Sequence, residues 1–166
     1  VGASSARMTA AVAAAFASTL AEPGVSSLGG GGFLLVREAD GTQQVVDFFT
    51  TVPSGPAGQR ETVTVVYSGA TQDFHVGNAT VAVPGCLDGF LTAHRTWGRL
   101  PLADVVGPAI SYAHDGVLLD ARQAHAMALI EPVLLLTEAA RMRMAPDGVL
   151  LGDGDQYRDT EFAVLL

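Results

Sequence analysis

The sequence predicts a mixed α/β or α+β domain in which antiparallel strands are covered by helices. An alanine-rich stretch with helical spacing opens the chain, two short apolar runs joined by Asp40-Gly41 follow, and helical patterns dominate the second half. The length of 166 residues fits one domain, and 49% hydrophobic against 16% charged residues provides material for a packed core.

The first third is expected to contain a helix and a β-hairpin. Apolar side chains at helical spacing predict a helix over residues 7–21, which Glu22-Pro23-Gly24 ends. A run of four glycines, Gly29–Gly32, then leads into a strand over residues 33–38. A short turn joins this strand to a second one over residues 43–49.

The middle of the chain combines a loop with further strands. Residues 51–60 concentrate proline, glycine and serine without periodicity, which is typical of a loop. Apolar runs predict strands over residues 62–67 and 79–83.

Helical patterns account for most of the remaining chain. They cover residues 84–98, 102–115 and 120–136. Pro108 and Pro132 lie inside the last two patterns, and each is expected to break the helix or to begin a new first turn, because proline lacks the N–H that an interior position donates.

Both ends of the chain have the character of interior segments. Residues 162–166 read Phe-Ala-Val-Leu-Leu, an apolar run without an obvious partner, and residues 1–5 enter an apolar helix almost directly. We therefore expect residues 1–166 to form one incomplete domain whose last segment continues in, or packs against, further polypeptide.

Composition excludes several classes of function. The chain has no lysine, and nine arginines against 17 acidic residues give a net charge of −8, so no nucleic-acid partner is expected. The apolar stretches are shorter than the roughly 18–20 residues that cross a bilayer, so no membrane insertion is expected. The absence of lysine also excludes Schiff-base and P-loop chemistry.

The residues that carry chemistry form no metal or cofactor motif, so neither is predicted. The four histidines are scattered without a second ligand at helical spacing. The single cysteine, Cys86, is expected to be a small buried hydrophobe. The glycine run lacks the dinucleotide-binding spacing, and it is expected either to pack tightly against a neighbouring strand or to line a ligand pocket.

Several short motifs follow one another in a recognisable order. They are Glu22-Pro23, Leu28-Gly29-Gly30-Gly31-Gly32-Phe33, Val46-Asp47-Phe48, Val83-Pro84-Gly85 and Trp97-Gly98-Arg99-Leu100-Pro101. Together they resemble the large subunit of γ-glutamyltransferases and related acylases over nearly the whole chain. The resemblance implies an N-terminal-nucleophile hydrolase, an αββα sandwich of two antiparallel sheets between helical layers, of which this chain supplies part.

The resemblance further implies that the nucleophile lies outside this chain. In such enzymes the precursor cleaves itself, and the new N-terminal Thr of the small subunit attacks an amide with its own α-amine as base. No residue here is therefore predicted to be catalytic. The implied partners are the small subunit from the same precursor and a small-molecule amide substrate, while periplasmic, secreted and cytoplasmic locations all stay open.

The resemblance also indicates where substrate binds. The family's large subunit grips the α-carboxylate of the γ-glutamyl group with the Arg of an Asp-Phe-Arg-Glu motif, which here reads Asp47-Phe48-Phe49-Thr50. Phe49 offers apolar contact but no charge, so altered acyl specificity is expected. We predict substrate contacts from Phe49, Thr50, Gly30 and Gly31, and the alternative for Phe49 is an ordinary core position in the strand.

Three functions remain open at this point. The first is an amidohydrolase or acyltransferase whose acyl specificity has changed. The second is a catalytically inactive, ligand-binding homologue on the same scaffold. The third is a structural module without a pocket, which the glycine run disfavours.

Overall fold

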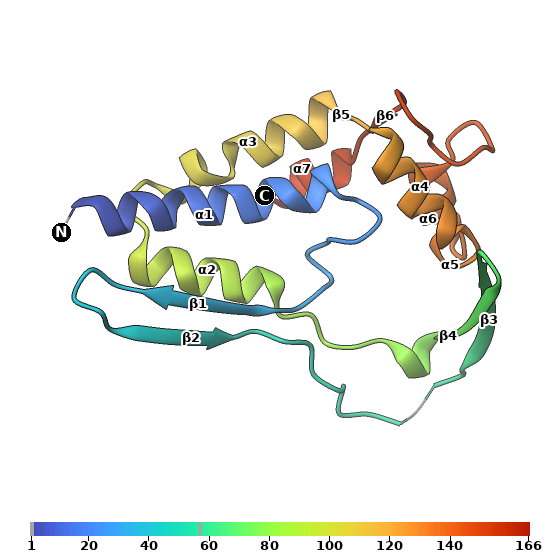
Figure 1. Ribbon diagram of the computed structural model, residues 1–166, viewed down its shortest axis with the longest axis horizontal. Coiled ribbons are helices and arrows are strands. Elements are labelled where there is room, and N and C mark those ends of the chain that lie inside the picture. The colour runs from blue at the N-terminus through green and yellow to red at the C-terminus, as the bar shows by residue number, and fades with distance from the viewer. Residues whose placement is uncertain (1, 57) are drawn as a thin grey trace.

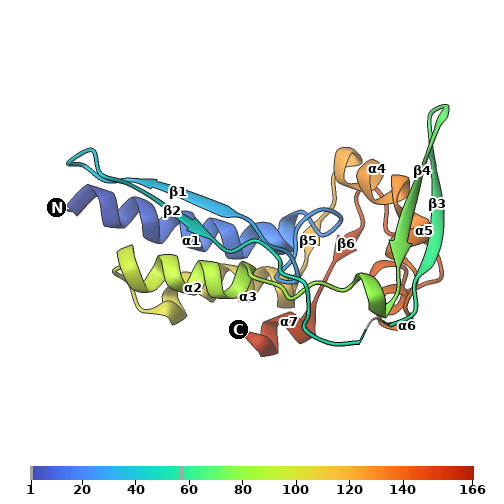
Figure 2. The same ribbon diagram turned by 90° about the horizontal axis from the view of Figure 1, so that it is seen from below.

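Three helices packed side by side form one end of the molecule in the computed structural model, which describes residues 2–56 and 58–166. They are α1 (Gly2–Ala21), α2 (Cys86–Trp97) and α3 (Leu102–Asp115) (Figures 1 and 2). The buried side chains of this first core are Val12, Phe16, Ala93, Val105, Val106 and Ala109. Val1 and Ala57, which belong to the predicted N-terminal segment and the predicted loop, lie outside the described residues.

The helix predicted over residues 7–21 is confirmed as α1. Val12, Phe16 and Leu20, spaced four residues apart, form its buried stripe. The fully buried ring of Phe16 meets Phe90 of α2 edge to face, with centroids 5.2 Å apart. Ala93 of α2 and Ala109 of α3 are buried in the same core, and their small side chains let these helices pack closely on α1.

The predicted β-hairpin is also confirmed. β1 (Phe33–Arg37) pairs antiparallel with β2 (Gln43–Asp47), and we call this pair the first hairpin. Its inner face includes Leu34, which packs against the first core, and the buried Val36. Its outer face consists of Phe33, Leu35, Arg37, Gln43, Val45 and Asp47, all of which are exposed.

A second hairpin follows, and it corrects two predictions. β3 (Glu61–Tyr67) confirms the strand at 62–67, but it pairs with the unpredicted β4 (Ala70–Val76). The strand expected at 79–83 is wrong, because η1 (Asn78–Thr80) is a 3₁₀ turn. Gly77, with φ of +99°, reverses the chain there, and only Val83 forms a β-bridge, to Thr51.

The two prolines behave differently. Pro132 does separate α4 (Ala121–Leu129) from α5 (Glu131–Leu134), as predicted. Pro108 does not break α3, because Gly107 presents no Cβ to the proline ring and Asp104, whose carbonyl loses its helical partner, is exposed.

A second core lies at the other end of the molecule. It forms where α4, α6 (Glu138–Met144), α7 (Thr160–Leu165) and the short pair β5 (Val117–Leu118) and β6 (Gln156–Tyr157) meet the ends of α1 and α3. Its buried side chains are Leu20, Ala113, Leu119, Met127, Met144 and Tyr157. The apolar run at 162–166 falls in and just after α7, where Phe162 and Leu166 pack inward and Val164 and Leu165 are exposed.

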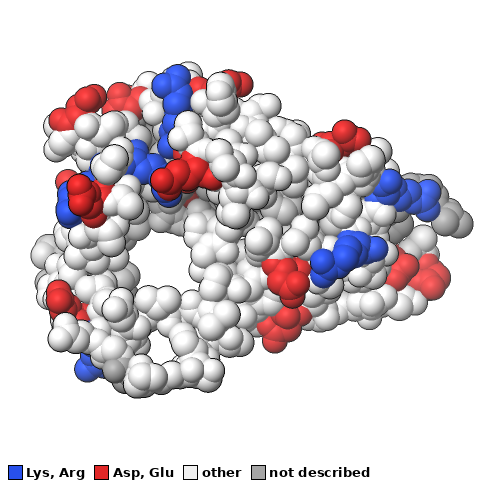
Figure 3. All heavy atoms as spheres, turned by 180° about the vertical axis from the view of Figure 1, so that it is seen from behind, with Lys and Arg blue, Asp and Glu red and all other residues white. Residues whose placement is uncertain are grey.

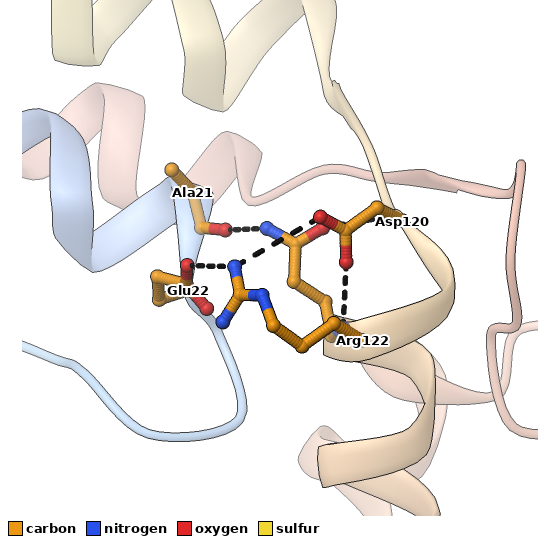
Figure 4. A network of polar contacts seen from close by, with 5 residues as sticks. Ala21, Glu22, Asp120 and Arg122 are labelled. Atoms are coloured by element: carbon orange, nitrogen blue, oxygen red, sulfur yellow. Dashed lines mark hydrogen bonds and ion pairs between the residues drawn. The ribbon is translucent and has the colours of Figure 1, made fainter.

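Polar contacts join the end of α1 to the start of α4 (Figure 4). The Arg122 guanidinium lies 2.8 Å from a Glu22 carboxylate oxygen and 3.8 Å from one of Asp120. Glu22 raises the pKa of Arg122, mainly by accepting its hydrogen bond. Gln123 donates to the Ala21 carbonyl and completes a capping box with Asp120, so these contacts fix where α4 begins.

The chain closes around an opening. The second hairpin extends away from the first core, and β3 lies against α4 and α5 (Figure 1). Seen from behind, the space-filling surface has a hole that passes between the two ends of the molecule (Figure 3). None of the helices in the described ranges is long and apolar enough to span a membrane.

Candidate functional site

The glycine turn lies directly against the segment that follows β2. A Cβ on Gly31 would sit 2.5 Å from the Thr50 nitrogen and 2.9 Å from the Phe49 carbonyl carbon, so only glycine fits without a shift of backbone. The structure thus brings three of the predicted site residues into one place. The glycine run does pack closely against a neighbouring segment, which was one of its two expected roles.

Gly30 connects this turn to α2. Its carbonyl accepts hydrogen bonds from the backbone nitrogens of Gly85 at 3.0 Å and Cys86 at 3.1 Å. The buried Cys86 thiol lies beside it, and burial raises the pKa of that thiol. A neutral, buried thiol is a poor nucleophile, so Cys86 is the buried hydrophobe that the sequence predicted.

Phe48 is held between glycines on two sides. Its backbone exchanges hydrogen bonds of 3.0 and 3.3 Å with Gly32, which extends the pairing of the first hairpin. On the other side, a Cβ on Gly85 would meet the Phe48 carbonyl oxygen at 2.1 Å, and one on Gly89 would meet the ring at 2.2 Å. The ring also contacts Phe90 edge to face, with centroids 5.9 Å apart.

Phe49 points away from this packing. It follows β2, its N–H donates to the Asp47 carboxylate at 2.9 Å, and its side chain is 57% exposed. Its ring stacks on Phe33, with centroids 5.5 Å apart and 14° between the planes. Phe49 is therefore not a core position of this chain, and Thr50 beside it is half-buried.

An apolar pocket of about 200 Å³ lies between α1, α2 and the first hairpin. Its lining includes Met8, Val12, Phe33, Leu34, Phe48 and Phe90. Phe33 thus contributes both to this pocket and to the stack with Phe49. Residues 48–50 therefore have apolar neighbours on two sides: the pocket toward the helices and the Phe33 ring on the outer face.

Ionisable groups do not gather into a metal centre. Within residues 2–56 and 58–166, no three His, Cys, Asp or Glu side chains are placed to hold an ion. His75 lies 3.2 Å from the Thr62 hydroxyl and His114 lies 2.9 Å from Asp115, both exposed. His94 contacts the Leu100 carbonyl at 2.9 Å, at the end of α2.

Sequence reasoning missed three residues of this site. Gly85 and Gly89 are four residues apart at the start of α2 and so share one helix face, which is a signal for close packing. Phe33 directly follows the glycine run. None of the three was assigned to the site, because their common partners, Phe48 and Phe49, are far away in the sequence.

Comparison with known proteins gives one consistent result. The family model described as gamma-glutamyltranspeptidase matches residues 3–166. The acylase ACY 1 proenzyme of Pseudomonas sp. (strain SE83) is 38% identical over 115 residues, which cover 66% of this chain and 21% of that protein. The glutathione hydrolase proenzyme of Bacillus subtilis (strain 168) is 32% identical over 157 residues, or 93% of this chain and 26% of that protein.

The fold is that of solved members. The crystal structure of Helicobacter pylori gamma-glutamyltranspeptidase superposes with a TM-score of 0.78 at 24% identity, covering 95% of this chain and 45% of that one. The predicted fold class, a mixed helix and strand part of a larger N-terminal-nucleophile fold, is thereby confirmed. The chain spans only 21% to 26% of the length of the two proenzymes above.

Proposed function

This chain belongs to the γ-glutamyltranspeptidase family, and on that premise we propose that it is the large-subunit portion of an amide hydrolase or acyltransferase. The nucleophile is an N-terminal Thr in polypeptide outside residues 1–166. This assignment is supported by the family match and by the share of the proenzymes that the chain spans, which leaves most of their length to other segments.

The proposed reaction proceeds through an acyl-enzyme. The Thr hydroxyl oxygen attacks the amide carbonyl carbon while the α-amine of the same residue takes the hydroxyl proton. The C–N bond then breaks, and the leaving amine departs with that proton. Water, or an acceptor amine, adds to the ester carbonyl, transfers its proton and releases the Thr hydroxyl. Base and nucleophile in one residue need little reorientation.

The uncovered outer face of the first hairpin carries this proposal. Leu35 and Val45 are 64% and 65% exposed, and Phe33, which stacks on Phe49, lies between them and residue 49 at the edge of this face. An apolar face of this kind on a two-stranded sheet needs a second layer to cover it. We assign that layer to the small subunit from the same precursor, which then carries its Thr next to Phe49 and Thr50.

The acyl specificity is proposed to differ from that for γ-glutamyl groups. Phe49 stands where the family's carboxylate-binding Arg is expected, and a bidentate guanidinium contact cannot be replaced by a phenyl ring. Free γ-glutamyl amides should therefore bind weakly, and amides with another acyl group should bind better.

Intact-mass analysis of the full gene product tests the proposed function. We expect two fragments from one precursor, the smaller with Thr at its N-terminus. An uncleaved product without such a Thr would instead identify the chain as part of a catalytically inactive, ligand-binding homologue, which is the alternative function.

Restoring the cation tests the placement of Phe49. In the full protein, Phe49→Arg should raise kcat/KM toward γ-glutamyl p-nitroanilide by about tenfold or more, as expected when one charge-assisted contact is regained. Phe49→Leu, which restores no charge, is the matched control. Unchanged kinetics in Phe49→Arg would place residue 49 outside the acyl-binding site.

A further inference from the structure

We propose that Phe33 and Phe49 together form the acyl-recognition surface, and that it takes an uncharged aromatic acyl group. This inference rests on the proposed function and names the substrate class for the same site. It adds Phe33, on β1, as a second residue that determines specificity.

The geometry of the aromatic pair carries the argument. The two rings are nearly parallel, with 14° between their planes and 5.5 Å between their centroids, and each is more than half exposed. A pre-stacked pair presents a wide apolar surface without further loss of side-chain freedom. A third ring can add to it by offset or edge-to-face contact, which a flexible aliphatic chain does less well.

The backbone beneath the pair is fixed. Gly31 touches the backbone of residues 49 and 50, and the Phe48 backbone is bound to Gly32 and packed against Gly85. The backbone that carries the Phe49 ring is thus held by close packing, and the backbone of Phe33 is held by its pairing with Asp47. The aromatic surface is therefore placed on a rigid support, as a specificity-determining surface requires.

The charges around the pair disfavour an anionic acyl group. Asp47 pairs with Phe33 across the two strands, and its carboxylate is held by the Phe49 N–H at 2.9 Å. A carboxylate on the substrate beside Phe49 would meet this negative charge. Arg37 shares the outer face of β1, but it is four residues beyond Phe33, about 13 Å along a strand.

Three primary amides distinguish the effect of an aromatic ring from that of a charged group on the acyl part of the substrate. Phenylacetamide carries the ring, L-glutamine is the corresponding γ-glutamyl amide, and acetamide carries neither. With the full-length protein, measured by ammonia release, we expect a higher kcat/KM for phenylacetamide than for L-glutamine. We expect Phe33→Leu to lower kcat/KM for phenylacetamide by about tenfold, mainly by raising KM. The variant loses one contact between aromatic rings and part of the apolar contact area with the substrate.

The controls separate recognition from stability. Acetamide makes no ring contact, so Phe33→Leu should lower its kcat/KM by a smaller factor than that for phenylacetamide. Phe74→Leu, which removes a half-buried ring from β4, should leave the ratio between phenylacetamide and L-glutamine unchanged. A preference for L-glutamine, or an equal loss on all three amides in Phe33→Leu, would overturn the inference and leave the proposed function intact.

A protein that hydrolyses no amide and shows no new N-terminal Thr would refute the proposed function instead. The aromatic surface is then tested by calorimetric titration of the wild-type protein and Phe33→Leu with phenylacetamide. Weaker binding to the variant supports the inference, and equal binding or no binding to the wild type overturns it.

Discussion

The two hairpins share a local architecture but have opposite outer surfaces. In the second hairpin the outer face carries Thr62, Thr64, Asp73 and His75, with cross-strand contacts of 2.7 Å from Thr64 to Asp73 and 3.2 Å between Thr62 and His75. The outer face of the first hairpin carries Phe33, Leu35 and Val45 beside Arg37, Gln43 and Asp47, whereas Val66 is the exposed large apolar residue on that of the second. The second face is suited to water, whereas the first is suited to another layer of protein.

The hairpins also differ in what holds them to the rest of the molecule. The second is fixed by side chains, above all the buried Val65, where β3 lies against α4 and α5. The extension of the first, at Phe48–Thr50, is fixed by backbone contacts with glycines. Backbone packing of this kind leaves the Phe49 ring and the outer face free for function.

The largest effect is expected when a charge is placed on the outer face of the first hairpin. Leu35→Lys in the full protein should prevent stable association of the two fragments that we propose, because an ammonium group buried at their interface without a partner costs several kcal/mol. Thr71→Lys, at an exposed position of the second hairpin, should have no such effect. Co-purification of the fragments and the yield of mature protein measure this, and equal yields would show that both faces are solvent surfaces.

A second change tests the backbone packing of the first hairpin. Gly85→Ala should destabilise the protein by about 3 kcal/mol or more, because the new Cβ would meet the Phe48 carbonyl oxygen at 2.1 Å. Gly55→Ala, with nothing within 4 Å, is the matched control and should change little. Urea unfolding measures both, and equal stabilities would contradict the close packing.

A third change tests the side-chain anchor of the second hairpin. Val65→Ala should cost about 2 kcal/mol, since the side chain is 2% exposed and leaves a small cavity. The neighbouring Val66, on the outer face and 70% exposed, is the control, and Val66→Ala should cost less than about 0.5 kcal/mol. If urea unfolding showed a larger loss of stability for Val66→Ala than for Val65→Ala, then Val66, and not Val65, would face α5.

The smallest effect lies in the turn of the first hairpin. The Asp40 carboxylate accepts the Thr42 N–H at 2.9 Å, and hydrogen bonds from Thr42 lower the pKa of Asp40. Because the pKa of Asp40 is lower in the folded state, the hydrogen bonds from Thr42 stabilise the fold fully above the unfolded pKa of about 3.9. This stabilisation is lost as the pH falls through the pKa of the folded state.

A carbon-13 NMR titration of Asp40 should therefore give a midpoint below that of an unfolded peptide. Thr42→Val, which keeps the backbone donor and removes the hydroxyl, should move the midpoint part of the way back. An Asp40 midpoint equal to that of the peptide would show that the turn is open in solution.

Local signals made much of the fold predictable. Helical spacing at Val12, Phe16 and Leu20 identified α1, and the apolar runs on both sides of Asp40-Gly41 identified the first hairpin. The family resemblance is confirmed by the match over residues 3–166. The assignment of substrate contacts to Phe49, Thr50, Gly30 and Gly31 stays a prediction, although the structure places these residues together.

Other elements could not be read from local pattern. β4 was missed because residues 70–76 contain no apolar run, and the role of Asp73 and His75 as the polar side of a strand depends on pairing with Thr64 and Thr62. The apolar residues at 79–83 suggested a strand that has no partner strand beyond the bridge at Val83. Non-local pairing decides such segments.

Sequence signals for two short helices were present but not used. Thr137 caps α6 by accepting the Ala140 N–H, and Asp159 caps α7 by accepting the Phe162 N–H. Both caps are of the residue types that begin helices. The apolar run after Thr160 was interpreted as an interior segment instead of a short helix.

The opening enclosed when β3 docks on α4 and α5 constrains how the molecule is assembled. The contacts of β3 with α4 and α5 close this ring. If a strand of the proposed small subunit passes through it, we expect one continuous precursor to fold both parts together more readily than two separately folded fragments combine.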